Sequence, residues 1–144
     1  MVVYADTSFL FSLYGNDANS AQARPIGDAL KDPLAFTPLH RHELRNAFRL
    51  AVFRKILTLE RCQAVLSDIE VDIKTGALTE TPVSWAEVYA EAEALSAAHT
   101  EKLGTRASDV LHVAAAAALG VKCFYTFDTR QKALAVKTGM KVKP

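Results

Sequence analysis

Short apolar runs alternate with longer helical patterns along this chain. Five runs are short and apolar or rich in strand-forming residues, and polar or turn residues bound them, as is typical of buried strands. They cover residues 2–5, 34–37, 79–83, 121–126 and 140–142. The run at 79–83 is either a connection or an edge strand, because Pro82 cannot donate a hydrogen bond to a ladder.

Seven helices are predicted between these runs, at residues 9–14, 17–30, 38–56, 60–75, 84–102, 109–119 and 129–138. Ser84 with Glu87 forms a capping-box pattern, and Thr58 and Ser108 are candidate N-caps. Asn16 or Asp17 could cap the second helix, which Pro25 is expected to kink or divide. Strands that alternate with helices predict an α/β fold with a parallel sheet covered on both faces.

Composition predicts a single domain over residues 1–144. Half of the residues are hydrophobic, enough for a sizeable core, and no repeat or linker interrupts the chain. Cys62 and Cys123 are too few and too far apart for a disulfide framework or a zinc site. No signal-peptide pattern is present, and the longest apolar run falls short of the ~20 residues that a membrane span needs. We therefore expect a cytoplasmic protein with no membrane partner.

Two acids follow predicted strands. Asp6 comes directly after the first strand, and Asp128 comes soon after the strand at 121–126. Ligands of parallel sheets bind at the carboxyl ends of the strands, so both carboxylates are expected at one edge. Each has a simpler interpretation as a helix cap.

Two further acids lie on helices with apolar surroundings. Asp109 begins a helix that is apolar almost all round, where a carboxylate also opposes the helix dipole favourably. Glu43 shares an inner stripe with apolar residues, and a lone carboxylate is costly to bury there unless it pairs with Arg45 or reaches solvent. The four acids could converge on one crevice.

Clustered carboxylates repel one another unless a cation lies between them. Carboxylate oxygens are the ligands that Mg²⁺ and Mn²⁺ prefer, and no paired cysteine or histidine ligands favour zinc. Four acids suit one or two such ions about 3.5–4 Å apart, which activate water and stabilise the leaving oxygen of a phosphodiester.

These motifs resemble the PIN domain family, and in particular its VapC-like toxins of type II toxin–antitoxin pairs. The resemblance rests on Asp6-Thr7-Ser8, on Glu43, on Asp109 before an alanine-rich helix, and on Thr126-Phe127-Asp128 with Arg130 beyond. It covers residues 2–142 and implies a three-layer α/β/α sandwich. The implied activity is an Mg²⁺- or Mn²⁺-dependent endoribonuclease, with Asp6, Glu43, Asp109 and Asp128 as catalytic residues and metal ligands. His112 departs from the family pattern, which usually has an aliphatic residue there.

The resemblance also implies partners. VapC-like toxins commonly dimerise, and an antitoxin covers their acidic crevice, often with a basic side chain. Apolar groups on several faces of the helices at 9–14 and 38–56, such as Phe9, Phe11 and Phe53, favour a homodimer. Candidate RNA-binding residues near the acids are Thr7, Ser8, Arg41, Arg45, Thr126 and Arg130. The alternative is that the arginines form a solvated helix face.

Other functions stay open at this stage. A PIN-like module could bind RNA or a protein without cutting. A dehalogenase-type phosphatase needs a second aspartate two residues after the first, where this chain has Ser8. A phospho-acceptor receiver domain needs an acidic pair ahead of its acceptor, and Ala5-Asp6 does not supply one.

Overall fold

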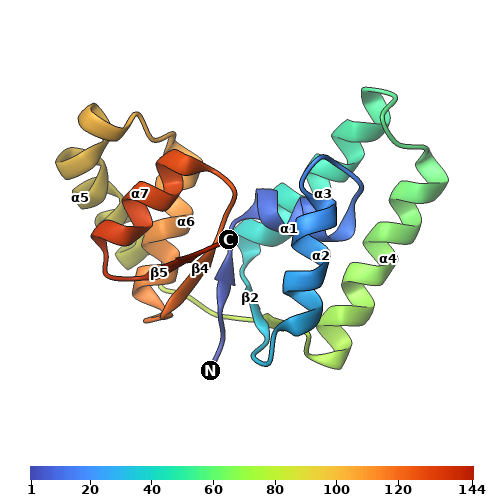
Figure 1. Cartoon of the computed structure of the whole chain (residues 1–144), viewed down its shortest axis with the longest axis horizontal. Coiled ribbons are helices and arrows are strands. Elements are labelled where there is room, and N and C mark those ends of the chain that lie inside the picture. Colours follow the sequence, from blue (N-terminus) through green and yellow to red (C-terminus); the bar gives the residue numbers. More distant parts are fainter. The chain divides into compact units, whose positions relative to one another are not determined.

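The computed structural model describes all 144 residues, which form seven helices and five strands (Figure 1). The chain divides into two compact units. Unit 1 consists of Met1, Val3–Asp6 and Pro82–Pro144, and unit 2 consists of Val2 and Thr7–Thr81. No helix is both long and apolar enough to cross a membrane.

Unit 1 is built on a parallel sheet with the strand order β1-β4-β5. Its strands are β1 (Tyr4–Ala5), β4 (Cys123–Tyr125) and β5 (Lys141–Lys143). Its helices are α5 (Trp85–Leu103), α6 (Ala107–Ala118) and α7 (Thr129–Lys137). Helix α6 packs between α5 and α7, and its alanine-rich middle is fully buried because small side chains allow close approach.

An aromatic pair fixes the first strand of unit 1. Tyr4 pairs with Phe124 in the ladder, and their rings stack with centroids 5.5 Å apart. The Tyr4 hydroxyl contacts His112 Nδ1 at 2.7 Å, and both side chains are buried. His112 is therefore a packed core residue that ties α6 to β1, immediately before Asp6.

Unit 2 contains a two-stranded parallel sheet of β2 (Leu34–Phe36) and β3 (Leu78–Glu80). Its helices are α1 (Thr7–Tyr14), α2 (Ser20–Ala29), α3 (Pro38–Phe53) and α4 (Leu59–Thr75). Helices α3 and α4 pack side by side (Figure 1). The Tyr14 hydroxyl of α1 donates to Asp72 of α4, and burial together with this bond raises the pKa of Tyr14.

The predicted PIN-like α/β fold with parallel strands is confirmed, but one predicted capping bond and the starts of two helices are wrong. Ser84 is the N-cap of α5 and makes no side-chain capping bond. Helix α6 begins at Ala107 with Arg106 as its N-cap, so Ser108 lies inside the first turn. Asn19 is the N-cap of α2, and Pro25 lies within this one helix without dividing it.

Candidate active site

Asp6 lies at the carboxyl end of β1. Its backbone N–H donates to the Tyr125 carbonyl at 3.0 Å, which continues the ladder between β1 and β4. Its side chain is buried, and the Thr126 hydroxyl donates to Asp6 Oδ2 at 3.1 Å. The ends of two neighbouring strands therefore hold this carboxylate.

Asp128 lies two residues after Thr126 and caps α7. The Asp128 N–H donates to the Thr126 hydroxyl at 3.1 Å, while Asp128 Oδ1 accepts from the Gln131 N–H at 2.8 Å. The Thr126 hydroxyl thus joins the side chain of Asp6 to the backbone of Asp128. Both interpretations of Asp128 hold, because it caps a helix and also lies at the end of a central strand.

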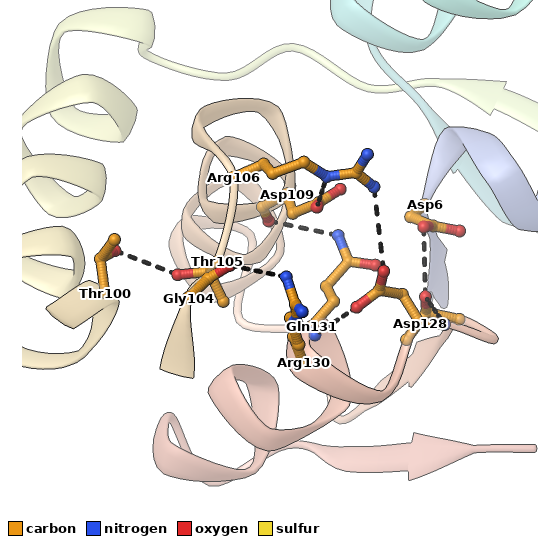
Figure 2. A network of polar contacts seen from close by, with 10 residues as sticks. Asp6, Thr100, Gly104, Thr105, Arg106, Asp109, Asp128, Arg130 and Gln131 are labelled. Atoms are coloured by element: carbon orange, nitrogen blue, oxygen red, sulfur yellow. Dashed lines mark hydrogen bonds and ion pairs between the residues drawn. The ribbon is translucent and has the colours of Figure 1, made fainter. Parts of the chain in front are cut away.

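Asp109 lies in the first turn of α6, half-buried. Its carbonyl accepts from the Gln131 side-chain amide at 3.2 Å, so Gln131 contacts both Asp109 and Asp128 (Figure 2). Asp109 Oδ2 accepts from Arg106 Nε at 3.1 Å, and Arg106 Nη2 lies 3.8 Å from Asp128 Oδ2. The bond to Asp109 raises the pKa of the Arg106 guanidinium.

Glu43 belongs to unit 2, on helix α3. Thr37 caps this helix by accepting from the His40 N–H, and the His40 ring in turn accepts from the Thr37 N–H, so the first turn is fixed by a capping box. The Thr7 hydroxyl donates to Glu43 Oε1 at 2.8 Å, which joins α1 to α3. The chain passes from unit 1 to unit 2 between Asp6 and Thr7.

Arg41 and Arg45 both contact Glu70 of α4, at 2.7 Å and 3.1 Å. The bond from Arg41 lowers the pKa of Glu70 and raises that of Arg41. Arg41 also reaches Glu80 at 3.4 Å. Glu70, which lies far along the chain, therefore partly neutralises the charge of both arginines within unit 2.

The other candidate RNA-binding residues are polar and differ in exposure. Ser8 and Arg130 are exposed, and Thr7 is half-buried. Arg130 Nη1 donates to the Gly104 carbonyl at 3.4 Å, while Thr126 is fully buried.

A shallow groove of about 410 Å³ lies beside Thr7 and Ser8 in unit 2. Apolar side chains from α1 and α3 form much of its wall, including Phe11, Ala47 and Leu50. The groove therefore offers an apolar surface next to the hydroxyl that holds Glu43.

Two residues of this network were missed in the sequence. Arg106 lies three residues before Asp109, a spacing that brings two side chains together on a helix and could have indicated the pair. Gln131 lies three residues after Asp128, which matches a capping box with aspartate in place of serine. Its side chain turns to the Asp109 carbonyl instead, and that contact depends on how α6 packs against α7.

The chemistry of the donors fits a hard divalent cation, because the side chains of Asp6, Asp109 and Asp128 offer carboxylate oxygens, the ligands that such ions prefer. The structure contains no preformed group of three or more His, Cys, Asp or Glu side chains that could hold a metal ion. Arg106 is the cation that contacts two of these acids.

Parallel strands that end in carboxylates, with an alanine-rich helix contributing a further acid, define an α/β protein with an acidic strand edge. The sequence matches the PIN domain family over residues 3–137, and the chain belongs to this family. No match was found among curated proteins.

Several solved structures share this fold. The chain is similar to the sarcin–ricin-loop-cleaving toxin VapC20 of Mycobacterium tuberculosis, with a TM-score of 0.67, 19% identity, and 91% and 93% of the two chains covered. It is similar to FitAcB of Neisseria gonorrhoeae, with a TM-score of 0.67, 15% identity, and 99% and 97% covered. It is also similar to VapBC2 of Rickettsia felis, solved with promoter DNA, with a TM-score of 0.64, 16% identity, and 99% and 98% of the two chains covered.

Proposed function

We propose that this protein is a metal-dependent endoribonuclease and the toxin of a toxin–antitoxin pair. The observation that carries the proposal is the polar network of unit 1, in which Thr126 links Asp6 to Asp128 and Gln131 links Asp128 to Asp109. Carboxylates so fixed at strand ends suit a divalent cation. Membership of the PIN family removes the phosphatase and receiver-domain alternatives.

We further propose that the two units act as one domain, in which Glu43 completes the acid set. Two observations support this. Thr7, which bonds Glu43, directly follows Asp6 in the chain. The three structures compared above also match 91% to 99% of the chain, a length that includes both units.

In this proposal Mg²⁺ or Mn²⁺, when bound, activates water and stabilises the leaving oxygen of an RNA phosphodiester. Asp6, Glu43, Asp109 and Asp128 hold the ion. The Thr126 hydroxyl orients Asp6, and Gln131 fixes the backbone of Asp109. Thr7, Ser8, Arg41, Arg45 and Arg130 are the proposed contacts to RNA. Each guanidinium has five N–H donors, so an arginine that bonds to another part of the protein keeps donors for phosphate.

An antitoxin is the proposed protein partner, because the chain belongs to the PIN family and is similar to the toxin VapC20 and to VapBC2. The apolar groove beside Thr7 and Ser8 is a suitable surface for an amphipathic segment. A segment bound there would lie next to the Thr7–Glu43 pair.

Purified wild-type chain with Mg²⁺ should cleave RNA, and Asp6→Asn should reduce cleavage by about 100-fold or more, since it removes a proposed ligand. The melting temperature should stay equal or rise slightly, because one carboxylate fewer relieves repulsion. Asp32→Asn, an exposed loop acid in unit 2, is the matched control. Expression of the wild type should stop growth, while Asp6→Asn should be tolerated. Equal cleavage by both proteins would refute the assignment.

A second candidate is a PIN-like module that binds RNA or protein without cutting. The ion pairs of Arg106 favour it, because an internal cation contacts two of the proposed ligands. A Mn²⁺ titration separates the two candidates: a non-cutting module is expected to give no binding at millimolar metal, whereas the nuclease gives saturable binding.

A further inference from the structure

Arg106 reaches acids from two different helices. It is the N-cap of α6, with an extended backbone at φ −84° and ψ 157°. Its side chain folds over the start of the helix, so that Nε contacts Asp109 Oδ2 and Nη2 approaches Asp128 Oδ2 at the start of α7 (Figure 2). One guanidinium therefore bridges two proposed metal ligands.

Arg106 contacts carboxylate oxygens that make no hydrogen bond to Gln131. Asp128 Oδ1 accepts from the Gln131 N–H at 2.8 Å, and its Oδ2 faces Arg106. Gln131 also holds Asp109, but through the carbonyl, which leaves the Asp109 carboxylate to Arg106. Helix α6 and Gln131 thus hold the backbone of Asp109, and α7 holds Asp128, while the guanidinium hydrogen-bonds the Asp109 carboxylate and places positive charge beside both acids.

This cation can be displaced. The side chain of Arg106 is 75% exposed, against 14% for Asp109 and 33% for Asp128. Water competes with an exposed pair, so such a pair shifts an equilibrium by only about twofold to fivefold. A guanidinium and a divalent ion repel each other and cannot share the same carboxylate oxygen.

We propose that Arg106 is a built-in counter-ion of the acid pair Asp109–Asp128, which occupies the cation position in the metal-free chain and leaves it when metal binds. The proposal rests on the proposed metal-dependent function. The measured affinity for metal then reflects a competition between the metal ion and the guanidinium for the same carboxylates, because each binding event must displace Arg106. The guanidinium is a positioning group in the metal-free chain and competes with the ion for these oxygens.

Calorimetric titration of the purified full chain with MnCl₂ tests this directly. Arg106→Gln should bind Mn²⁺ about two to five times more tightly than the wild type, because no internal cation has to leave. Arg106→Lys keeps the charge but not the two-armed geometry, so its affinity should fall between the two. Arg130→Gln is the matched control: Arg130 begins the neighbouring helix and contacts a backbone carbonyl, not a carboxylate.

Melting curves give a second readout that needs no activity. Without metal, Arg106→Gln should melt slightly below the wild type, because the two carboxylates lose their counter-ion. Saturating Mn²⁺ should raise the melting temperature of Arg106→Gln by more than it raises that of the wild type. The proposal is overturned if Arg106→Gln binds Mn²⁺ equally or more weakly, or if Arg130→Gln tightens binding as much. Absence of any Mn²⁺ binding by the wild type would instead reject the proposed metal-dependent function.

Discussion

Gln131 is fully buried, and its backbone N–H and side-chain amide nitrogen contact residues of the acid network. Its side-chain oxygen, Oε1, is buried without a hydrogen-bond partner. A buried acceptor left unpaired costs about 1–3 kcal/mol. The amide orientation is nevertheless fixed, because turning it over would place Oε1 against the Asp109 carbonyl, where two acceptors would meet.

Replacement of Gln131 by leucine should separate stability from activity. The change loses one hydrogen bond and also removes the unpaired oxygen, so the free energy of unfolding in urea should change by less than about 1 kcal/mol. RNA cleavage should fall by about 10- to 100-fold, because Asp109 is no longer held from α7. Gln63→Leu, at an exposed position of α4, serves as the control. Unchanged cleavage would show that Gln131 does not position the acids.

The helices and strands could be predicted because local chemistry sets them. Thr58 caps α4 as predicted by accepting from the Arg61 N–H, and Gly76 ends the helix in a left-handed conformation at φ 88°. The strand-end placement of Asp6 and Asp128 follows from the same local patterns. Ser84 and Ser108 make no capping bond for different reasons. Ser84 is the N-cap of α5 but its side chain makes no capping bond, whereas Ser108 lies inside the first turn of α6.

Contacts between distant elements could not be predicted. Arg106 meets Asp128, and Arg41 meets Glu70, only after whole helices have packed. Apolar periodicity gives the face on which a helix packs, but not the neighbour that a long polar side chain reaches. The predicted basic surface of α3 is for this reason partly an ion-pair network between α3 and α4.

Glu70→Gln should weaken this link in a pH-dependent way. The pKa of Glu70 is lowered from its ordinary value of 4.5, chiefly by the bond from Arg41, so its stabilisation is present above that value and is lost as the pH falls through the lower folded-state pKa. At pH 7 the variant should lose about 0.5 kcal/mol in urea unfolding, because the pair is partly exposed. The difference should shrink below pH 4.5 and in high salt. Glu91→Gln, at an exposed position of α5, should show no such dependence of stability on pH or salt.

The apolar surface of the whole molecule differs from the surface expected from sequence. Phe9 is buried, and Phe11 stacks on Phe48 with ring centroids 4.5 Å apart, so α1 uses most of its apolar groups inside the fold. Four of the exposed apolar residues instead lie around the junction of α3 and α4. They are Leu50, Phe53, Ile56 and Leu59.

We predict that this junction contributes to a homodimer. Phe53 is 82% exposed, and burying such a ring against a second copy removes a large apolar surface from water. Light scattering should give a dimer for the wild type at tens of micromolar and a larger monomer fraction for Phe53→Ser. Val136→Ser, at an exposed apolar position on α7, should leave the mass unchanged. A monomeric wild type at this concentration would contradict the dimer.

Unit 1 is discontinuous, since β1 comes from the start of the chain and pairs with β4 near its other end. The bond between Asp6 and Thr126 spans 120 residues of sequence. During translation at about 5–20 residues per second, roughly 6–24 seconds must pass between the synthesis of Asp6 and that of its partner. Unit 2 lies almost entirely between them and can begin to fold during this interval, whereas the acid network cannot exist on a nascent chain. A ribosome that makes this protein is therefore not exposed to a completed network until most of the chain has been synthesised.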